Sequence, residues 1–211
     1  MVKKVSGSIM FTDIVSSSKL WKKNYKKMLK ALLSHEKRMY KLVKKYKGCV
    51  VKTIGDSFML YFKNYKNAIN CAIDVQRDLI KKPLKIGSSK LKLRIGICHG
   101  NFIRQNIVYQ GKKLKDYLGP AVNIASRMES KASKEGEIAF AFIKNSLSNE
   151  QQLLDFFTKR KCKVHIRNFT KSCNIREKKR TRSSRLIYGY KCLNPKLLKG
   201  VGNVKAYIVK V

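Results

Sequence analysis

The sequence is poor in acidic residues, in proline and in long apolar runs. Only 12 of its 211 residues are Asp or Glu, and only 3 are Pro. No apolar run reaches the roughly 18 residues that a membrane-spanning helix needs, so we expect no such span. The first residues, MVKKVSGSIMF, lack the apolar region of a secretory signal peptide. These absences lead us to expect a cytoplasmic protein.

The six cysteines show no spacing that indicates a shared role. No two form a C-x-x-C pair and no Cys/His cluster has zinc-ligand spacing, which argues against a zinc site. Most lie in apolar stretches, as reduced core cysteines do, and a reducing cytoplasm is the simplest setting. Apolar residues make up 44% of the chain, which is typical of a globular protein. Because no proline-rich or glycine-rich linker interrupts the pattern, we expect residues 1–211 to form a single domain.

The chain is strongly basic: Lys and Arg number 49, and the formal net charge is +37. Such a field attracts nucleotides, nucleic acid or an anionic membrane face. The alternative is compositional drift toward lysine, which we favour for the charge as a whole because Lys is scattered and greatly outnumbers Arg. The divergent basic stretch at about 159–185 is interpreted as an insertion. Its solvated loop could make weak contacts with nucleic acid or an anionic surface.

Hydrophobic periodicity predicts that strands and helices alternate along the chain. The predicted strands are 5–14, 49–54, 58–62, 91–100, 137–142, 186–193 and 204–210. Helical spacing covers 18–46 and 64–82, and Gly119-Pro120 opens a third helix. This order matches the split βαβ arrangement. It predicts an α+β fold with a ferredoxin-like split βαβ sheet, helices on one face and extra C-terminal strands.

Two acidic residues stand out in a chain that has so few. Asp13 ends the first predicted strand, and Asp56 lies at the tip of the predicted hairpin. In a split βαβ sheet these strands are neighbours, so both carboxylates can meet at one end and hold magnesium. The helix start at Ser16, Ser17 and Ser18 offers free N–H groups to a phosphate beside them. The alternative is structural: Asp13 caps the helix and Asp56 serves the turn.

Ordered motifs add a family resemblance to this pattern. The segments are MFTDIVSSSKLW at 10–21, VVKTIGDSFMLYF at 50–62, LRIGICHG at 93–100, DYLGPAVNIASRMES at 116–130 and LKGVGNVKAYIV at 198–209. In order and spacing they resemble the signature segments of class III adenylate and guanylate cyclases. The match covers most of residues 5–142 and resumes near 198. The resemblance implies the cyclase fold and a phosphorus–oxygen lyase activity.

The resemblance also implies a role for each matching residue. Asp13 and Asp56 match the aspartates that hold two Mg²⁺ (or Mn²⁺) ions, one activating the ribose 3′-hydroxyl and one holding the triphosphate. Asn123 matches the residue that orients the ribose. Arg127 matches the arginine that stabilises the transition state, and Lys199 resembles the lysine that binds the triphosphate.

Base selection is implied by Lys52 and Asp116, which carry the adenine set of the family. Asp accepts a hydrogen bond from the exocyclic amino group of adenine, and Lys donates to a ring nitrogen. The implied reaction converts ATP to 3′,5′-cyclic AMP and pyrophosphate. Leu118 departs from the aromatic residue that is common in the family, so cyclisation of a pyrimidine nucleotide or GTP stays an alternative.

The whole implied catalytic set is present in one chain, which predicts a head-to-tail homodimer with two equivalent sites. Two other hypotheses remain. The chain could be a cyclase-like protein that binds nucleotide without turnover, or a basic nucleic-acid-binding protein, although the K/R-G-F/Y-G/A-F-V-x-F/Y pattern of RNA-binding sheets is absent. His35 and His99 are interpreted as structural residues.

Overall fold

The structure, a computed structural model, describes residues 2–109, 111–143, 150–169 and 204–211. Its main sheet contains β1 (Val2–Ile14), β2 (Gly48–Ile54), β3 (Ser57–Phe62), β6 (Leu93–Tyr109), β7 (Lys112–Leu118), β8 (Glu137–Phe142), β9 (Lys163–Phe169) and β10 (Val204–Lys210). The helices are α1 (Ser17–Lys23), α2 (Tyr25–Lys45), α3 (Tyr65–Lys81), α4 (Pro120–Arg127) and α5 (Glu150–Lys159). A small hairpin joins β4 (Lys85–Ile86) to β5 (Ser89–Lys90), and a π-helical turn, Met128–Ala132, follows α4. Among these residues, no helix is long and apolar enough to cross a membrane.

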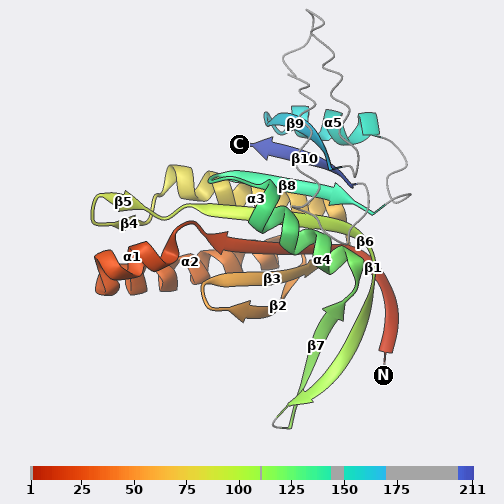
Figure 1. Ribbon diagram of the computed structural model, residues 1–211, viewed down its shortest axis with the longest axis horizontal. Coiled ribbons are helices and arrows are strands. Elements are labelled where there is room, and N and C mark those ends of the chain that lie inside the picture. Colours follow the sequence, from red (N-terminus) through yellow and green to blue (C-terminus); the bar gives the residue numbers. More distant parts are fainter. Residues whose placement is uncertain (1, 110, 144–149, 170–203) are drawn as a thin grey trace, which may run out of the picture.

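The sheet confirms the predicted α+β class and is arranged in the order β2-β3-β1-β6-β8-β10-β9, with β7 paired to β6 (Figure 1). Strand β1 lies between β3 and β6 and is antiparallel to both, whereas β6 and β8 run parallel. The register brings Thr12 opposite Phe58 on one side and Asp13 opposite Arg94 on the other. The ends of β1, β3 and β6 therefore present polar side chains at one place.

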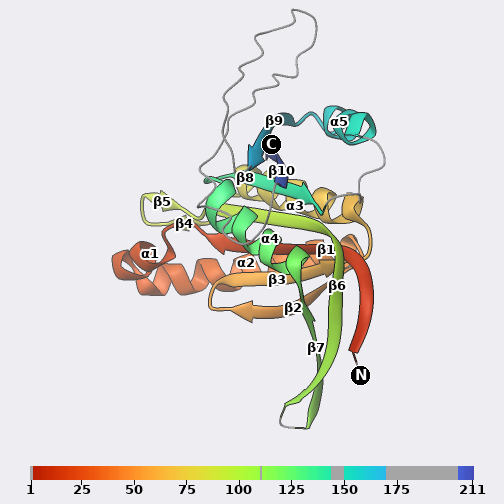
Figure 2. The same ribbon diagram turned by 45° about the vertical axis from the view of Figure 1, so that its right-hand side comes forward.

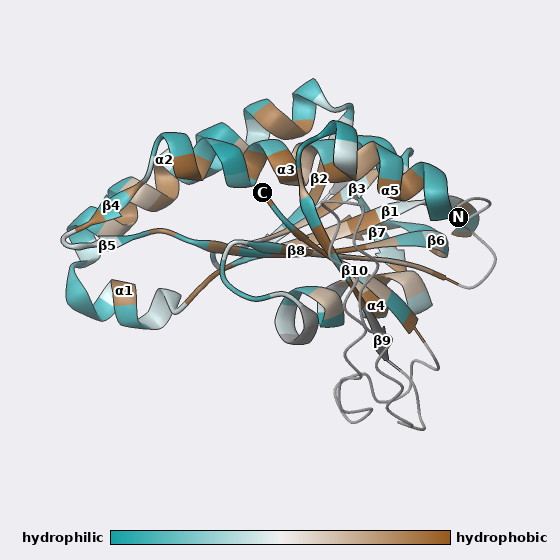
Figure 3. Ribbon diagram, turned by 90° about the horizontal axis from the view of Figure 1, so that it is seen from above, coloured by the Kyte–Doolittle hydropathy of each residue, from teal (hydrophilic) through white to brown (hydrophobic). Residues whose placement is uncertain are grey.

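Helices cover both faces of the sheet, which corrects the expectation of helices on one face. Helices α2, α3 and α5 lie on one side and α4 on the other (Figure 3). The reason is that the central strands bury residues of both parities. Met10 and Ile97 belong to the core under α2 and α3, whereas Ile9 belongs to the core under α4. A sheet that is apolar on both faces needs a cover on each.

The predicted helix over 18–46 is two helices, because the chain bends at Asn24. The backbone of Asn24 is extended, and its side chain accepts a hydrogen bond from the Lys27 N–H, which caps α2. Ser16 adopts a left-handed conformation (φ 57°) and its side chain makes no cap hydrogen bond. Met28, Met39 and Val43 of α2 are buried, whereas Tyr25 is exposed.

The sequence did not predict several elements. Strand β6 is longer than expected and forms, with β7, a hairpin that projects beyond the rest of the sheet (Figure 2). Helix α5 and strand β9 were also not predicted, whereas the strand expected at 204–210 is confirmed as β10. The strand expected at 186–193, the segment 170–185 and Lys199 lie outside the described residues.

Candidate active site

Asp13 lies near the end of β1, where the register fixes two partners for its carboxylate. The Ser57 hydroxyl donates to Oδ1 at 2.7 Å, and Nη2 of Arg94 donates to Oδ2 at 2.6 Å. Ser57 follows directly after Asp56 in the β2–β3 turn, which Gly55 enables with a left-handed φ of 60°. The structure therefore brings Asp13 and Asp56 to the same end of neighbouring strands, as the sequence predicted.

Asp56 carries the observation that bears most directly on a bound cation. Its Oδ2 atom is buried and has no hydrogen-bond partner among the described residues. A buried carboxylate oxygen without a donor is costly, and a hard divalent cation is the kind of group that satisfies it. No group of three or more His, Cys, Asp or Glu side chains in the described part of the chain could hold a metal. Two carboxylates suit Mg²⁺, which is commonly held by one or two carboxylates together with substrate phosphates.

Arg94 and Glu129 extend this carboxylate site, and sequence reasoning had missed both. Nε of Arg94 lies 3.2 Å from Oε1 of Glu129, within ion-pair distance, but neither atom is aligned for a hydrogen bond. Burial raises the pKa of Glu129 to about 7; the Arg94 charge opposes this rise and the nearby Asp13 charge adds to it. The only signal in the sequence was the alternation of β6, which placed Arg94 on a polar face.

Lys52 on β2 and Asp116 on β7 form a direct ion pair. The Lys52 ammonium donates to both carboxylate oxygens of Asp116, at 2.9 and 2.8 Å. Oδ1 of Asp116 also accepts the Tyr117 N–H at 2.9 Å, which fixes the carboxylate. The pair that was expected to read the base is therefore in contact within one chain. Lys52 lies four residues before Asp56, on the strand that leads into the β2–β3 turn.

Asn123 and Arg127 lie one helical turn apart on α4, on the side away from the sheet. Asn123 is exposed and Arg127 is partly exposed, whereas Ile124 and Ala125 are buried against the sheet. The helix is anchored over Gly96 of β6, where an added Cβ would come within 2.0 Å of the Glu129 backbone nitrogen. Backbone contact at Gly96 therefore sets the height of α4 and of the π-helical turn above the sheet.

The remaining predicted site residues have simpler surroundings. The Ser16 carbonyl accepts from the N–H groups of Lys19 and Leu20, so Ser16, Ser17 and Ser18 form the first turn of α1 close after Asp13. His35 is buried at 2% exposure, and His99 Nδ1 lies 2.9 Å from the Ser8 hydroxyl. Both histidines are structural, as predicted.

Comparison with known proteins identifies the family to which these motifs belong. The chain matches the family model for the adenylate and guanylate cyclase catalytic domain over residues 2–210. It is 30% identical over 182 residues to receptor-type adenylate cyclase B of Leishmania donovani, covering 69% of this chain and 13% of that protein. It is 30% identical over 150 residues to an adenylate cyclase of Schizosaccharomyces pombe, covering 63% of this chain and 9% of that protein. The chain therefore spans only a small part of these relatives.

Solved structures show the same fold. The catalytic core of a rhodopsin-guanylyl cyclase with converted specificity superposes with a TM-score of 0.68 at 21% identity, covering 100% of this chain and 98% of that chain. The adenylyl cyclase CyaB from P. aeruginosa gives 0.66 at 20% identity, covering 100% and 96%. With the motifs in place on this fold and the family model matched along nearly the whole sequence, the chain belongs to the adenylate and guanylate cyclase catalytic domain family.

Proposed function

We propose that this protein converts ATP to 3′,5′-cyclic AMP and pyrophosphate. The observation that carries the proposal is the Lys52–Asp116 ion pair, because it presents an ammonium donor and a carboxylate acceptor together. Adenine offers the complementary edge, a ring nitrogen beside an amino group. The two carboxylates near the β2–β3 turn supply the cation-binding chemistry that a triphosphate requires. Both relatives described above, each 30% identical to this chain, are adenylate cyclases by name, which supports the choice of ATP.

The protein's own residues would divide the work as follows. Asp13 and Asp56 hold divalent cations, and Arg94 keeps Asp13 oriented through its hydrogen bond. Bound cations would supply Lewis-acid activation of the 3′-hydroxyl and would neutralise the triphosphate. Asn123 orients the ribose. Arg127 presents a fixed fork of donors to the charge that develops on the phosphoryl oxygens.

Two further groups would bind the triphosphate. The backbone N–H groups at Ser16, Ser17 and Ser18 would be available to an anion at the start of α1, and Lys199 would add a positive charge. No covalent intermediate is needed, because the 3′-oxygen attacks the α-phosphorus of the same molecule and pyrophosphate leaves. The residues therefore act by positioning and by stabilising charge.

The active unit is proposed to be a head-to-tail homodimer. One copy provides the metal-binding residues Asp13 and Asp56, and the other provides the Lys52–Asp116 ion pair together with Asn123 and Arg127. The β6–β7 hairpin supports this proposal, because it carries exposed apolar residues where it projects from the sheet: Ile103, Ile107, Val108, Leu114 and Leu118. Val108 is 67% exposed and Leu114 is 48% exposed. Apolar side chains that gather on one projecting element are typical of a protein interface.

The test is direct. Purified protein is incubated with each of the four ribonucleoside triphosphates and Mg²⁺ or Mn²⁺, and any cyclic product is identified by mass. We expect cyclic AMP from ATP, and loss of this product in Asp13→Asn and Asp56→Asn variants that keep the native circular dichroism. Full metal-dependent activity in Asp13→Asn would contradict the mechanism. A product only from GTP or a pyrimidine nucleotide would contradict the base assignment.

The residue at position 118 keeps cyclisation of GTP or a pyrimidine nucleotide as the second candidate function. Leu118 lies two residues after Asp116 and is leucine, where an aromatic residue is common in the family that the chain resembles. A leucine beside the base would discriminate less well between ring sizes than an aromatic side chain. The same assay separates the two candidates by the ratio of products.

A further inference from the structure

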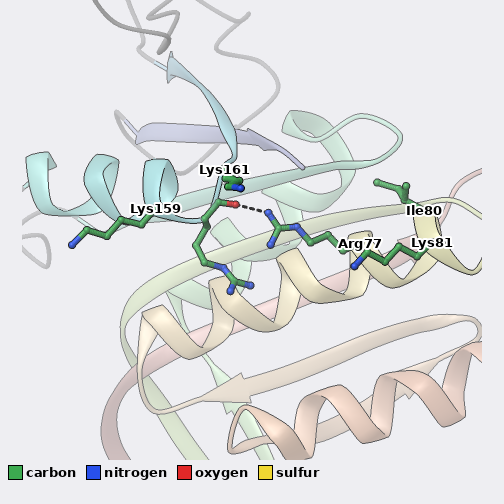
Figure 4. A pocket seen from close by; sticks show the side chains of 6 residues that line it. Arg77, Ile80, Lys81, Lys159 and Lys161 are labelled. Atoms are coloured by element: carbon green, nitrogen blue, oxygen red, sulfur yellow. Dashed lines mark hydrogen bonds between the residues drawn. The ribbon is translucent and has the colours of Figure 1, made fainter.

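A basic cavity lies between α3 and the end of α5, on the face of the sheet opposite to α4. A cavity of about 380 Å³ opens there, lined by Arg77, Ile80, Lys81, Lys159, Arg160 and Lys161 (Figure 4). Five of these six residues are cations, and none is an acid. The cavity belongs to the face covered by α2, α3 and α5, whereas Asn123 and Arg127 lie on α4 across the sheet. It is therefore separate from the candidate active site.

Among the described residues, Arg160 is the one lining cation that has a carboxylate partner. Asp74 pairs with Arg160 at 2.8 Å and with Lys45 at 2.9 Å, and it also accepts from Tyr46. Asp78, the next acid along α3, pairs with Arg38 on α2 at 3.0 Å. Both carboxylates of α3 are thus engaged by other elements.

Four lining cations keep an uncompensated charge. Within the described part of the chain, Arg77, Lys81, Lys159 and Lys161 have no acidic partner within ion-pair distance. Like charges that line one cavity repel one another and raise the local potential. A bound anion of matching charge removes this cost.

One of the cations is held in place. Arg77 donates a hydrogen bond from Nη2 to the backbone carbonyl of Arg160, which ties the C-terminal part of α3 to the turn after α5 (Figure 4). Lys161 has a left-handed backbone (φ 53°) in that turn. A guanidinium fixed by a backbone contact loses less conformational freedom when it binds a phosphate.

Helix-end electrostatics explain only part of the cluster. Lys81 and Lys159 end α3 and α5, where a cation stabilises the exposed carbonyl groups. That explanation does not cover Arg77, which lies one turn inside α3, or Lys161, which lies beyond α5. It also does not account for the cavity that all of them share.

We infer that this cavity binds a small anion with two or more phosphate groups. Four uncompensated cations match the charge of an oligophosphate, and Arg with Lys is the usual combination for phosphoryl oxygens. The volume lies at the lower end of the range for small-ligand pockets, which suits a compact ligand. The site is independent of turnover and gives the protein a second place to bind phosphates.

The test uses isothermal titration calorimetry of the full chain with sodium tripolyphosphate, in EDTA and about 0.15 M KCl. Divalent cations are absent so that Asp13 and Asp56 do not create a second phosphate site. A Lys81→Gln/Lys159→Gln/Lys161→Gln variant is compared with a control, Lys37→Gln/Lys41→Gln/Lys44→Gln, on the exposed side of α2. All six lysines are exposed, so both variants lose the same charge and should fold.

We expect saturable binding with a stoichiometry near one, weakened at least about tenfold in the first variant and less than about twofold in the control. Equal weakening in both variants would overturn the inference, because the ligand would then respond only to the overall field. Absence of saturable binding to the unmodified chain would also overturn it. Retention on heparin or RNA that depends on these lysines, without tripolyphosphate binding, would assign the surface to nucleic acid instead.

Discussion

At the level of single residues, Arg94 controls the charge balance of the candidate metal site. Its guanidinium contacts Asp13 through one nitrogen and approaches Glu129 with another. Asp13 and Asp56 could be predicted from sequence, because two acids at strand ends are conspicuous in a chain with so few. Arg94 and Glu129 could not, because their contact depends on the β1–β6 register and on the π-helical turn.

Replacing Arg94 with Gln should lower the free energy of unfolding by about 1–3 kcal/mol, because Asp13 loses its charged partner in a partly buried site. Urea denaturation at neutral pH measures the effect. The control is Lys92→Gln, two residues away, whose ion pair with Glu135 is half exposed. The control should cost less than about 0.5 kcal/mol. Similar losses in both variants would show that the Arg94 contacts are no stronger than a surface pair.

His35 should make stability depend on acid pH. Burial, helped by the Arg38 charge, lowers the pKa of His35 to about 4, against 6.5 for a free histidine. The unfolded chain therefore binds a proton that the folded chain excludes, and stability falls as the pH drops from about 6.5 toward 4. The loss attributable to His35 should be about 2 kcal/mol between pH 8 and pH 5.

His35→Leu should remove that part of the acid sensitivity, because leucine keeps an apolar side chain in contact with Phe58 and carries no titrating group. Thermal unfolding of both proteins across this pH range provides the measurement. An unchanged pH profile in His35→Leu would assign the acid sensitivity to other groups.

At the level of secondary structure, the sequence predicted the strands and helices up to residue 142 better than their arrangement. Period-two and helical patterns identified β1, β3 and α3 with small errors at their ends. The break at Asn24 was missed because the apolar spacing continues across it. The face that α4 covers was missed because apolar and polar residues alternate in the first half of β6, which predicts that one face is exposed to solvent. In the structure that face is buried too, at Gly96 and Cys98.

Helix α4 should be highly sensitive to Gly96. In Gly96→Ala the new methyl group would meet the Glu129 backbone nitrogen and the Ala125 carbonyl, at 2.0 and 2.4 Å, and neither backbone can give way cheaply. We expect a loss of about 3 kcal/mol or more in stability, with a fall in cyclase activity because Asn123 and Arg127 shift with the helix.

Gly111→Ala is the matched control for this substitution. Gly111 has a positive φ of 73° but open space around its Cα, so alanine there should cost only about 1 kcal/mol of backbone strain. Chemical denaturation and the product assay applied to both variants separate the two effects. Equal costs at Gly96 and Gly111 would mean that α4 is not held by close backbone packing.

At the level of the whole molecule, a head-to-tail homodimer predicts complementation between two inactive chains. Asp56→Asn removes a proposed metal ligand and Arg127→Ala removes a group that the partner copy would supply. A mixed dimer then has one site with both defects and one intact site. Co-expressed with different tags and purified as the mixed species, it should regain about half of the unmodified activity, whereas each variant alone stays inactive. No recovery in a verified mixed dimer would place both residues in the same site of one chain.

The ion pair of Lys52 with Asp116 has a consequence for how nucleotide preference can change over time. Each side chain is the other's counter-charge, so replacing one alone leaves the other charge unpaired beside an uncharged base. A lineage that moves toward a different nucleobase would therefore need to exchange both residues, because a change at one alone leaves a donor and acceptor set that suits neither base. Mutual dependence of this kind makes the base preference slow to change in evolution, even on a surface that otherwise tolerates abundant lysine.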